Sequence, residues 1–199
     1  MAFIRTVLLS LAALAIAFAG GAWSAKAMLD HFSGSDILRV GPWQADRMAG
    51  SPNADPYSRA SYARQGSLAP GLGEGVSFRA ALDSSGQALH TNCTYRLSGR
   101  VPAARLYSLA AFSVDGQMLV AQPSNLPAYL LSSGLARNDA NEAPIIVSAT
   151  AQPGNWLALA GNRPYVLALT LYDTPVTTST GAAVPVMPSI ERLGCKPNG

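Results

Sequence analysis

Residues 165–172 read Tyr-Val-Leu-Ala-Leu-Thr-Leu-Tyr, and this stretch decides the fold. Tyr165, Leu167, Leu169 and Leu171 occupy every second position, so four large apolar side chains share one face. A period of two is typical of a β-strand with one face against a core. The sequence therefore predicts a long strand here, and its partners set the fold class.

Further segments have strand-like patterns, at residues 76–82, 93–98, 106–114 and 145–150. The segment 106–114 is apolar on both faces, which is typical of a buried central strand. Asp115-Gly116 follows it and is a two-residue hairpin signal. We therefore expect residues 118–120 to return as the paired strand.

One short helix is predicted among the strands. Asp55 suits an N-cap, Pro56 suits the first helical position, and Gly66 suits the position after the end. Residues 36–40 fit one helical turn, and residues 174–199 fit an extended tail. Short strands with frequent turns and one such helix predict a mainly β fold, an antiparallel β-sandwich or jelly roll.

The N-terminus has the pattern of a membrane segment. Arg5 precedes an apolar run, and the uncharged stretch 6–25 is 20 residues long, about the length that crosses a bilayer. Ala25-Lys26-Ala27 also fits the small-x-small end of a cleaved signal peptide. Residues 1–27 are thus either a transmembrane anchor through residues 6–25 or a signal peptide cut near Ala27.

Either reading takes the rest of the chain across a membrane. Arg5 favours a cytoplasmic N-terminus under the positive-inside rule. We expect a single-pass membrane protein with its C-terminal domain on the outer side of the membrane, or, after cleavage near Ala27, an exported protein. The expected organisation is the N-terminal segment 1–27, a connector over 28–54, a β-sandwich-like domain over 55–195 and a tail over 196–199.

Charge argues against nucleic-acid binding. Without Arg5 and Lys26 the chain carries 12 basic and 11 acidic residues. The arginines are scattered, and Lys196 is the only lysine that remains. No basic patch of the kind that nucleic acid requires is expected.

Cys93 and Cys195 both follow the N-terminal segment. Two cysteines in an oxidising compartment most simply form a disulfide, although two unpaired thiols remain the alternative. The bond would close a loop of about 100 residues and add on the order of 4–5 kcal/mol by the chain-entropy estimate.

No catalytic motif is present. The sequence from Gly71 to Val76 departs from G-x-G-x-x-G at its last position, and a strand follows where a helix is required. Two isolated histidines are too few for a metal site, and no cofactor is expected. His90 is the only histidine placed to act as a general base on the domain.

Four residues are candidates for ligand binding. Trp156 and Tyr107 offer an apolar face with a polar edge, as residues that line sugar or lipid grooves do, although a sandwich core also needs aromatic residues. Asp173 directly follows the clearest strand, where it can also simply end it. His90 lies between a turn and a strand.

Several segments together resemble the family called domain of unknown function 1214, found in bacterial envelope proteins. They span most of residues 41–195 in order, and the matching pieces are Asp55-Pro56-Tyr57-Ser58-Arg59-Ala60, Phe78-Arg79-Ala80-Ala81-Leu82-Asp83, Tyr95-Arg96-Leu97-Ser98-Gly99, Pro102-Ala103-Ala104-Arg105-Leu106-Tyr107-Ser108-Leu109, Asn155-Trp156-Leu157, Leu169-Thr170-Leu171-Tyr172-Asp173-Thr174-Pro175 and Pro188-Ser189-Ile190-Glu191-Arg192. The resemblance implies a β-sandwich-like domain with an N-terminal membrane segment. It also implies a single-pass protein of the bacterial inner membrane with its C-terminal domain in the periplasm, or, after cleavage near Ala27, a protein secreted to the periplasm. It implies no established activity and no catalytic residue.

Two functions remain open. The first is a non-enzymatic, membrane-anchored periplasmic β domain that scaffolds an envelope protein or binds a cell-surface glycan or lipid. The second is an envelope enzyme acting on carbohydrate or lipid, or a sugar-binding module, with Asp173 or His90 assisting. Convergence of Asp173, His90 and Trp156 on one cleft would favour the second.

Overall fold

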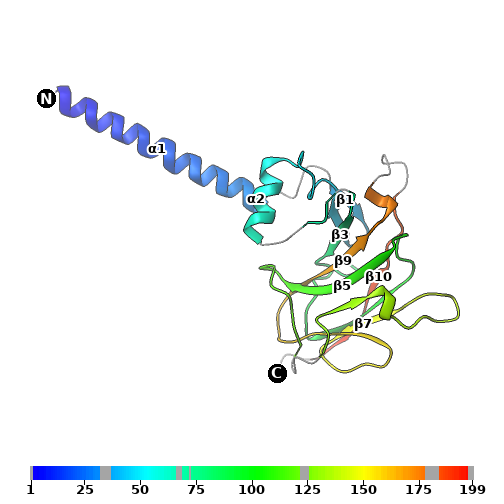
Figure 1. Ribbon diagram of the computed structural model, residues 1–199. Helices are drawn as coiled ribbons and strands as arrows, with labels where there is room; N and C mark the ends of the chain where they lie inside the picture. The colour runs from blue at the N-terminus through cyan, green and yellow to red at the C-terminus, as the bar shows by residue number, and fades with distance from the viewer. Residues whose placement is uncertain are drawn as a thin grey trace.

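The computed structural model describes residues 2–31, 37–65, 69–71, 73–121, 126–177 and 184–196. Helix α1 (Ala2–His31) stands away from a β domain and meets it beside α2 (Pro56–Gln65), as Figure 1 shows. Within α1, the span Phe3–Leu29 contains an 18-residue window with a mean hydropathy of 2.0, and no residue of that window is buried. By length and composition this helix can cross a membrane.

The β domain consists of two sheets. The larger has six strands in the order β1 (Ile37–Val40), β2 (Trp43–Asp46), β3 (Gly75–Ala80), β9 (Tyr165–Tyr172), β5 (Leu106–Ser113) and β6 (Tyr129–Leu131). The smaller has four strands in the order β10 (Ser189–Cys195), β4 (Cys93–Ser98), β7 (Ile145–Ser148) and β8 (Asn155–Ala158). Two short 3-10 turns, η1 (Ser132–Gly134) and η2 (Pro175–Thr177), complete the described elements.

The core lies between the two sheets. Strand β9 sends Tyr165, Leu167, Leu169 and Leu171 into it, and all four are almost completely buried. The other strands add inward side chains at every second position, among them Phe78, Leu109, Tyr95, Val147, Leu157 and Ile190. The predicted mainly β class is confirmed. The pairing is antiparallel except between β7 and β8, which are parallel.

The predicted helix is confirmed as α2. Asp55 Oδ1 accepts the backbone N–H of Tyr57 at 2.7 Å, which is the expected cap. Ser58 in its first turn donates to Asp55 Oδ2 and to Asp46 Oδ2, so the cap also fixes α2 to the end of β2. The predicted stop at Gly66 lies outside the described residues.

Five predicted strands are found at their predicted positions in the chain. Two of them have the predicted bounds, 93–98 and 165–172. The return over 118–120 is wrong as a strand, because only one bridge, Phe112 to Met118, forms. The turn before it does form: the backbone N–H of Gly116 donates to the carbonyl of Ser113 at 3.0 Å.

Several strands were not predicted. The range expected as a connector contributes β1 and β2, and the helical turn expected there is wrong. Gly41, with a φ of 56°, makes the turn between these strands. Trp43 is fully buried and donates its indole N–H to the carbonyl of Pro188 at 2.7 Å. The range 174–199, expected to be extended without a strand partner, likewise contains β10, which pairs along the whole length of β4. Strands β6 and β8 were also missed.

Candidate functional site

The outer face of the six-stranded sheet carries an open groove of about 700 Å³. This is the face turned away from the core. We call it the outer groove, and its lining residues are Ala69, Pro70, Glu74, Ser77, Arg79, Leu106, Ser108, Ala110, Phe112, Gly116, Met118, Tyr129, Leu131, Ala168, Thr170 and Tyr172. Its volume is typical of a small-molecule site.

Small residues on three adjacent strands form the floor of the outer groove. One row across the sheet pairs Ser77 of β3, Thr170 of β9 and Ser108 of β5. The next row pairs Ala168 of β9 with Ala110 of β5. Because outward side chains stand roughly perpendicular to a sheet, a patch of small residues among large ones leaves a trough.

Larger apolar side chains form the walls. Tyr172 and Leu106 pair across β9 and β5 on one side of the floor, and Phe112 and Met118 form a bridge on the other. Strand β6 closes one end with Tyr129 and Leu131. Met118, Tyr129, Leu131 and Tyr172 are each between 36% and 47% exposed, which is unusual for large apolar groups gathered on one surface.

The charged groups that line the outer groove, Glu74 and Arg79, both lie at its β3 end. Glu74 Oε2 accepts the backbone N–H of Gly71 at 3.1 Å. Arg79 also borders a small neighbouring cavity with Tyr62 of α2. Burial, followed by the charge of Asp46, raises the pKa of Tyr62, while the charge of Arg79 lowers it. The polar end of the outer groove therefore adjoins α2.

Two of the three floor hydroxyls are bonded to each other. Thr170 donates to Ser77 Oγ at 3.1 Å. No histidine or cysteine lines the outer groove, and the described residues contain no group of three or more His, Cys, Asp or Glu that could hold a metal ion. A surface of this composition is suited to binding an apolar group.

The four ligand-binding candidates from the sequence lie in different parts of the domain. Tyr107 faces the core and borders a separate cavity of about 460 Å³ that also includes Arg137. Burial raises the pKa of Tyr107, and the charge of Arg137 opposes this shift. Trp156 is half-buried on the outer face of the smaller sheet, where its indole N–H donates to the carbonyl of Ser148 at 2.9 Å.

The other two candidates lie at loop positions. Asp173 is exposed with a φ of 50°, and its backbone N–H donates to the carbonyl of Glu74. It follows Tyr172, a wall residue, but does not itself line the outer groove. His90 is half-buried, and its Nδ1 lies 2.7 Å from Asn92 Oδ1. No described cavity is lined by two of the four candidates.

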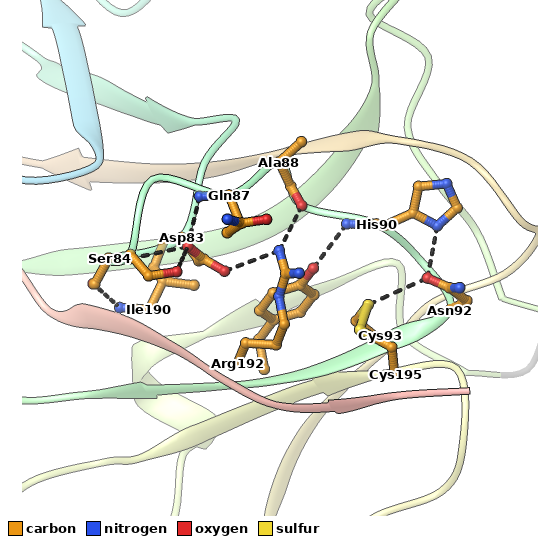
Figure 2. Close-up of polar contacts among 12 residues, drawn as sticks. Asp83, Ser84, Gln87, Ala88, His90, Asn92, Cys93, Ile190, Arg192 and Cys195 are labelled. Atoms are coloured by element: carbon orange, nitrogen blue, oxygen red, sulfur yellow. Dashed lines mark hydrogen bonds and ion pairs between the residues drawn. A yellow bond between two sulfur atoms is a disulfide. The ribbon is translucent and has the colours of Figure 1, made fainter. Parts of the chain in front are cut away.

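The predicted disulfide is confirmed. Cys93 and Cys195 face each other at the end of the β4–β10 ladder and are bonded (Figure 2). The backbone N–H of Lys196 donates to the carbonyl of Asn92, so the strand beyond the bond is also held. The bond joins the two strands that are farthest apart in sequence in the smaller sheet.

A buried ion pair supports the same ladder (Figure 2). Asp83 Oδ2 lies 3.0 Å from an Arg192 nitrogen, and the Asp83 side chain is completely buried. Asp83 Oδ1 accepts hydrogen bonds from the backbone and hydroxyl of Ser85 and from the backbone of Gln87. Burial acts to raise the pKa of Asp83, but these hydrogen bonds and the charge of Arg192 together hold it below its usual value.

Two tyrosines line the inner side of this ion pair. Arg192 lies over the ring of Tyr95 at 5.5 Å, and the Tyr95 hydroxyl accepts the backbone N–H of His90 at 2.9 Å. Tyr165 packs edge-on against Tyr95. The Tyr165 hydroxyl is buried without a hydrogen-bond partner among the described residues, and burial strongly raises its pKa. This cluster fixes the fold and offers no open surface to a ligand.

The outer groove was not predicted from the sequence. Along the sequence, the floor residues alternate with the large inward residues from which the strands are predicted. Each small residue taken alone therefore resembles an ordinary outward position of a strand. The signal was the run of small outward residues on two strands, Ser108 and Ala110 on one and Ala168 and Thr170 on the other. It becomes a site only once the register sets these four side by side.

One solved structure agrees with the fold. The VPA0106 protein from Vibrio parahaemolyticus has a similar structure, with a TM-score of 0.59 and 15% identity over 90% of this chain and 44% of its own. An uncharacterized protein from Burkholderia cenocepacia aligns over 75% of this chain and 46% of its own, with a TM-score of 0.41 and 19% identity. The chain thus spans less than half the length of either protein. No curated protein matches it.

The family comparison covers the centre of the β domain. Residues 74–176, more than half of the chain, match the family described as "Protein of unknown function (DUF1214)". The match takes in β3 to β9 and therefore most of the outer groove and all four candidate residues. The chain belongs to the DUF1214 family.

Proposed function

We propose that the protein is a membrane-anchored envelope protein whose β domain works by binding rather than by catalysis. In this proposal α1 stays in the bacterial inner membrane, and the β domain lies in the periplasm. The observation that carries the proposal is the combination of an apolar helix of 27 residues with a disulfide in the domain behind it. Such a bond persists in an oxidising compartment, and the helix is long enough to span the bilayer.

The binding role is supported by the outer groove, which has exposed apolar walls and no nucleophile–base pair in its lining. The alternative, an enzyme acting on carbohydrate or lipid or a sugar-binding module, has less support. Trp156, Asp173, Tyr107 and His90 line no common described cavity.

Fractionation of bacteria that express the full chain tests the proposal. We expect the chain to stay with the membrane after an alkaline wash, to be degraded by protease added to spheroplasts, and to carry no alkylatable thiol before reduction. The intact mass should include residues 1–27. A chain that begins at Met28 would instead show a cleaved signal peptide.

A matched variant separates the anchor from a signal peptide. Ala25→Leu with Ala27→Leu removes the small residues that a signal peptidase requires. For an anchor, the variant and the wild type should have the same mass apart from the substitutions and the same distribution between fractions. A wild-type chain that is soluble and shortened, beside a retained variant, would refute the anchor.

A further inference from the structure

We propose that the outer groove binds the acyl chain of a membrane lipid, with the polar head of the lipid at the β3 end. This inference rests on the proposed function, because it needs the domain beside a bilayer. It assigns an occupant to the outer groove.

The first argument is a change of polarity along the outer groove. The rows that form its floor run across the sheet from β3 to β6. Arg79 and Glu74 lie at the β3 end, the floor between is made of hydroxyl and methyl groups, and Tyr129 and Leu131 lie at the β6 end. A charged end followed by an apolar run matches a head group followed by a hydrocarbon chain.

The second argument is shape. From β3 to β6 the outer groove crosses three inter-strand steps, about 14 Å at the usual strand spacing. The long walls, Tyr172 with Leu106 and Phe112 with Met118, stand on either side of the small residues. A narrow trough with apolar walls accommodates a flexible hydrocarbon chain along its length better than it accommodates a ligand with a flat ring.

The third argument is position relative to the anchor. Helix α1 contacts α2, and Tyr62 of α2 shares a small cavity with Pro70 and Arg79 at the β3 end of the outer groove. Figure 1 shows α2 on the β1–β3 side of the larger sheet, between α1 and the strands. The polar end therefore lies nearest the membrane segment, where the head group of a lipid leaving the bilayer would be.

The outer face of the smaller sheet differs from this surface. One row there reads Glu191, Arg96, Ile146 and Trp156 across four strands, which places the charge of Arg96 inside the sheet and that of Glu191 on its edge strand. Ile146 therefore provides a matched control position, an outward residue on a strand of the opposite face.

Photocrosslinking of the full chain in lipid vesicles tests the proposal. The probe is a phosphatidylglycerol with a diazirine near the end of one acyl chain, and crosslinked peptides are identified by mass spectrometry. We expect labelled peptides from α1, which reports the anchor, and from β5 and β6, which report the outer groove. Ala110→Trp fills the floor from an outward position and should lower the β5 and β6 labelling at least tenfold while α1 labelling stays unchanged.

Two further variants keep the test independent of folding. Ile146→Trp adds the same side chain to the opposite face and should leave all labelling unchanged. Leu131→Asp places a charge at the exposed β6 end and should also reduce outer-groove labelling, so the result does not depend on Ala110→Trp alone. A near-ultraviolet circular dichroism spectrum and a Tm close to those of the wild type show that each variant is folded.

The outcomes separate the two proposals. Labelling of α1 without β5 or β6 would overturn the lipid site and leave the anchor intact. Labelling of neither region would overturn the proposed function as well. Labelling of β5 and β6 that persists in both groove variants would also overturn the site. A photoreactive residue in place of Tyr129 gives a further test. If it captures a second copy of the chain or another protein, and no lipid, the lipid site is overturned.

Discussion

Replacing Asp83 by asparagine tests whether the buried ion pair holds the end of the domain together. Asparagine keeps an oxygen for the three hydrogen bonds that Ser85 and Gln87 donate, but it turns an amide toward Arg192 in place of a carboxylate oxygen. Removing one partner of a buried pair costs about 3–5 kcal/mol. Arg192 is 29% exposed and can regain some water, so we expect a loss of about 2 kcal/mol.

Thermal unfolding of the full chain in a mild detergent, followed by near-ultraviolet circular dichroism, measures the loss. For a chain of this length, about 2 kcal/mol corresponds to a Tm lower by about 4–8 °C. Asp115→Asn, at an exposed turn, provides the control and should change the Tm by less than about 2 °C. Equal Tm values for Asp83→Asn and the wild type would refute the reasoning.

The same variant has a predicted dependence on pH. The folded pKa of Asp83 lies below its unfolded value of about 3.9, so its carboxylate stabilises the fold fully above that pH. This contribution is lost as the pH falls through the folded pKa. The difference in Tm between the wild type and Asp83→Asn should therefore be constant near neutral pH and shrink below about pH 4. A difference that grows on acidification would contradict the shift.

Three further predictions concern single features of the β domain. Replacing both Cys93 and Cys195 by alanine should lower the free energy of unfolding by about 4–5 kcal/mol, because the bond closes a loop with a sequence separation of 102. The Tm should fall accordingly, and an unchanged Tm would contradict this prediction. Tyr165→Phe removes a buried hydroxyl without a described partner, so the Tm should stay equal or rise by an amount equivalent to about 1 kcal/mol. A lower Tm would show that the hydroxyl is hydrogen-bonded. Gly75→Ala should cost about 2 kcal/mol or more in urea unfolding, since its Cβ would overlap the carbonyl of Leu171, and wild-type stability would disprove that contact.

The sequence predicts a feature well where local chemistry alone determines it. The inward side chains of Tyr165, Leu167, Leu169 and Leu171 have a strict period of two, and β9 has the predicted bounds. The cap at Asp55 is equally local, because it depends on hydrogen bonds within one turn. Both predictions needed no knowledge of distant residues.

Features that depend on partners distant in the chain were missed. Strand β10 has one fully buried apolar residue, Ile190, and a bulge at Leu193 that interrupts its alternation. Its pairing with β4, and not its own pattern, makes it a strand. The outer groove has the same cause: Ala110 and Ala168 become a floor because β5 and β9 pair in one register. The separation of Trp156 from Tyr107 likewise follows from the assignment of β8 to the smaller sheet and β5 to the larger.

The pairing of β4 with β10 also sets an order of events during synthesis. Strand β10 is made after every other described strand, about 90 residues later than β4. Until it arrives, one edge of β4 is open, Asp83 has no counter-charge from Arg192, and Cys93 has no partner. Contacts between such distant segments form late, because a long loop must close first. The domain can therefore reach its final form only after synthesis of β10. The disulfide between Cys93 and Cys195 thus distinguishes a domain that has paired β10 with β4 from one that has not.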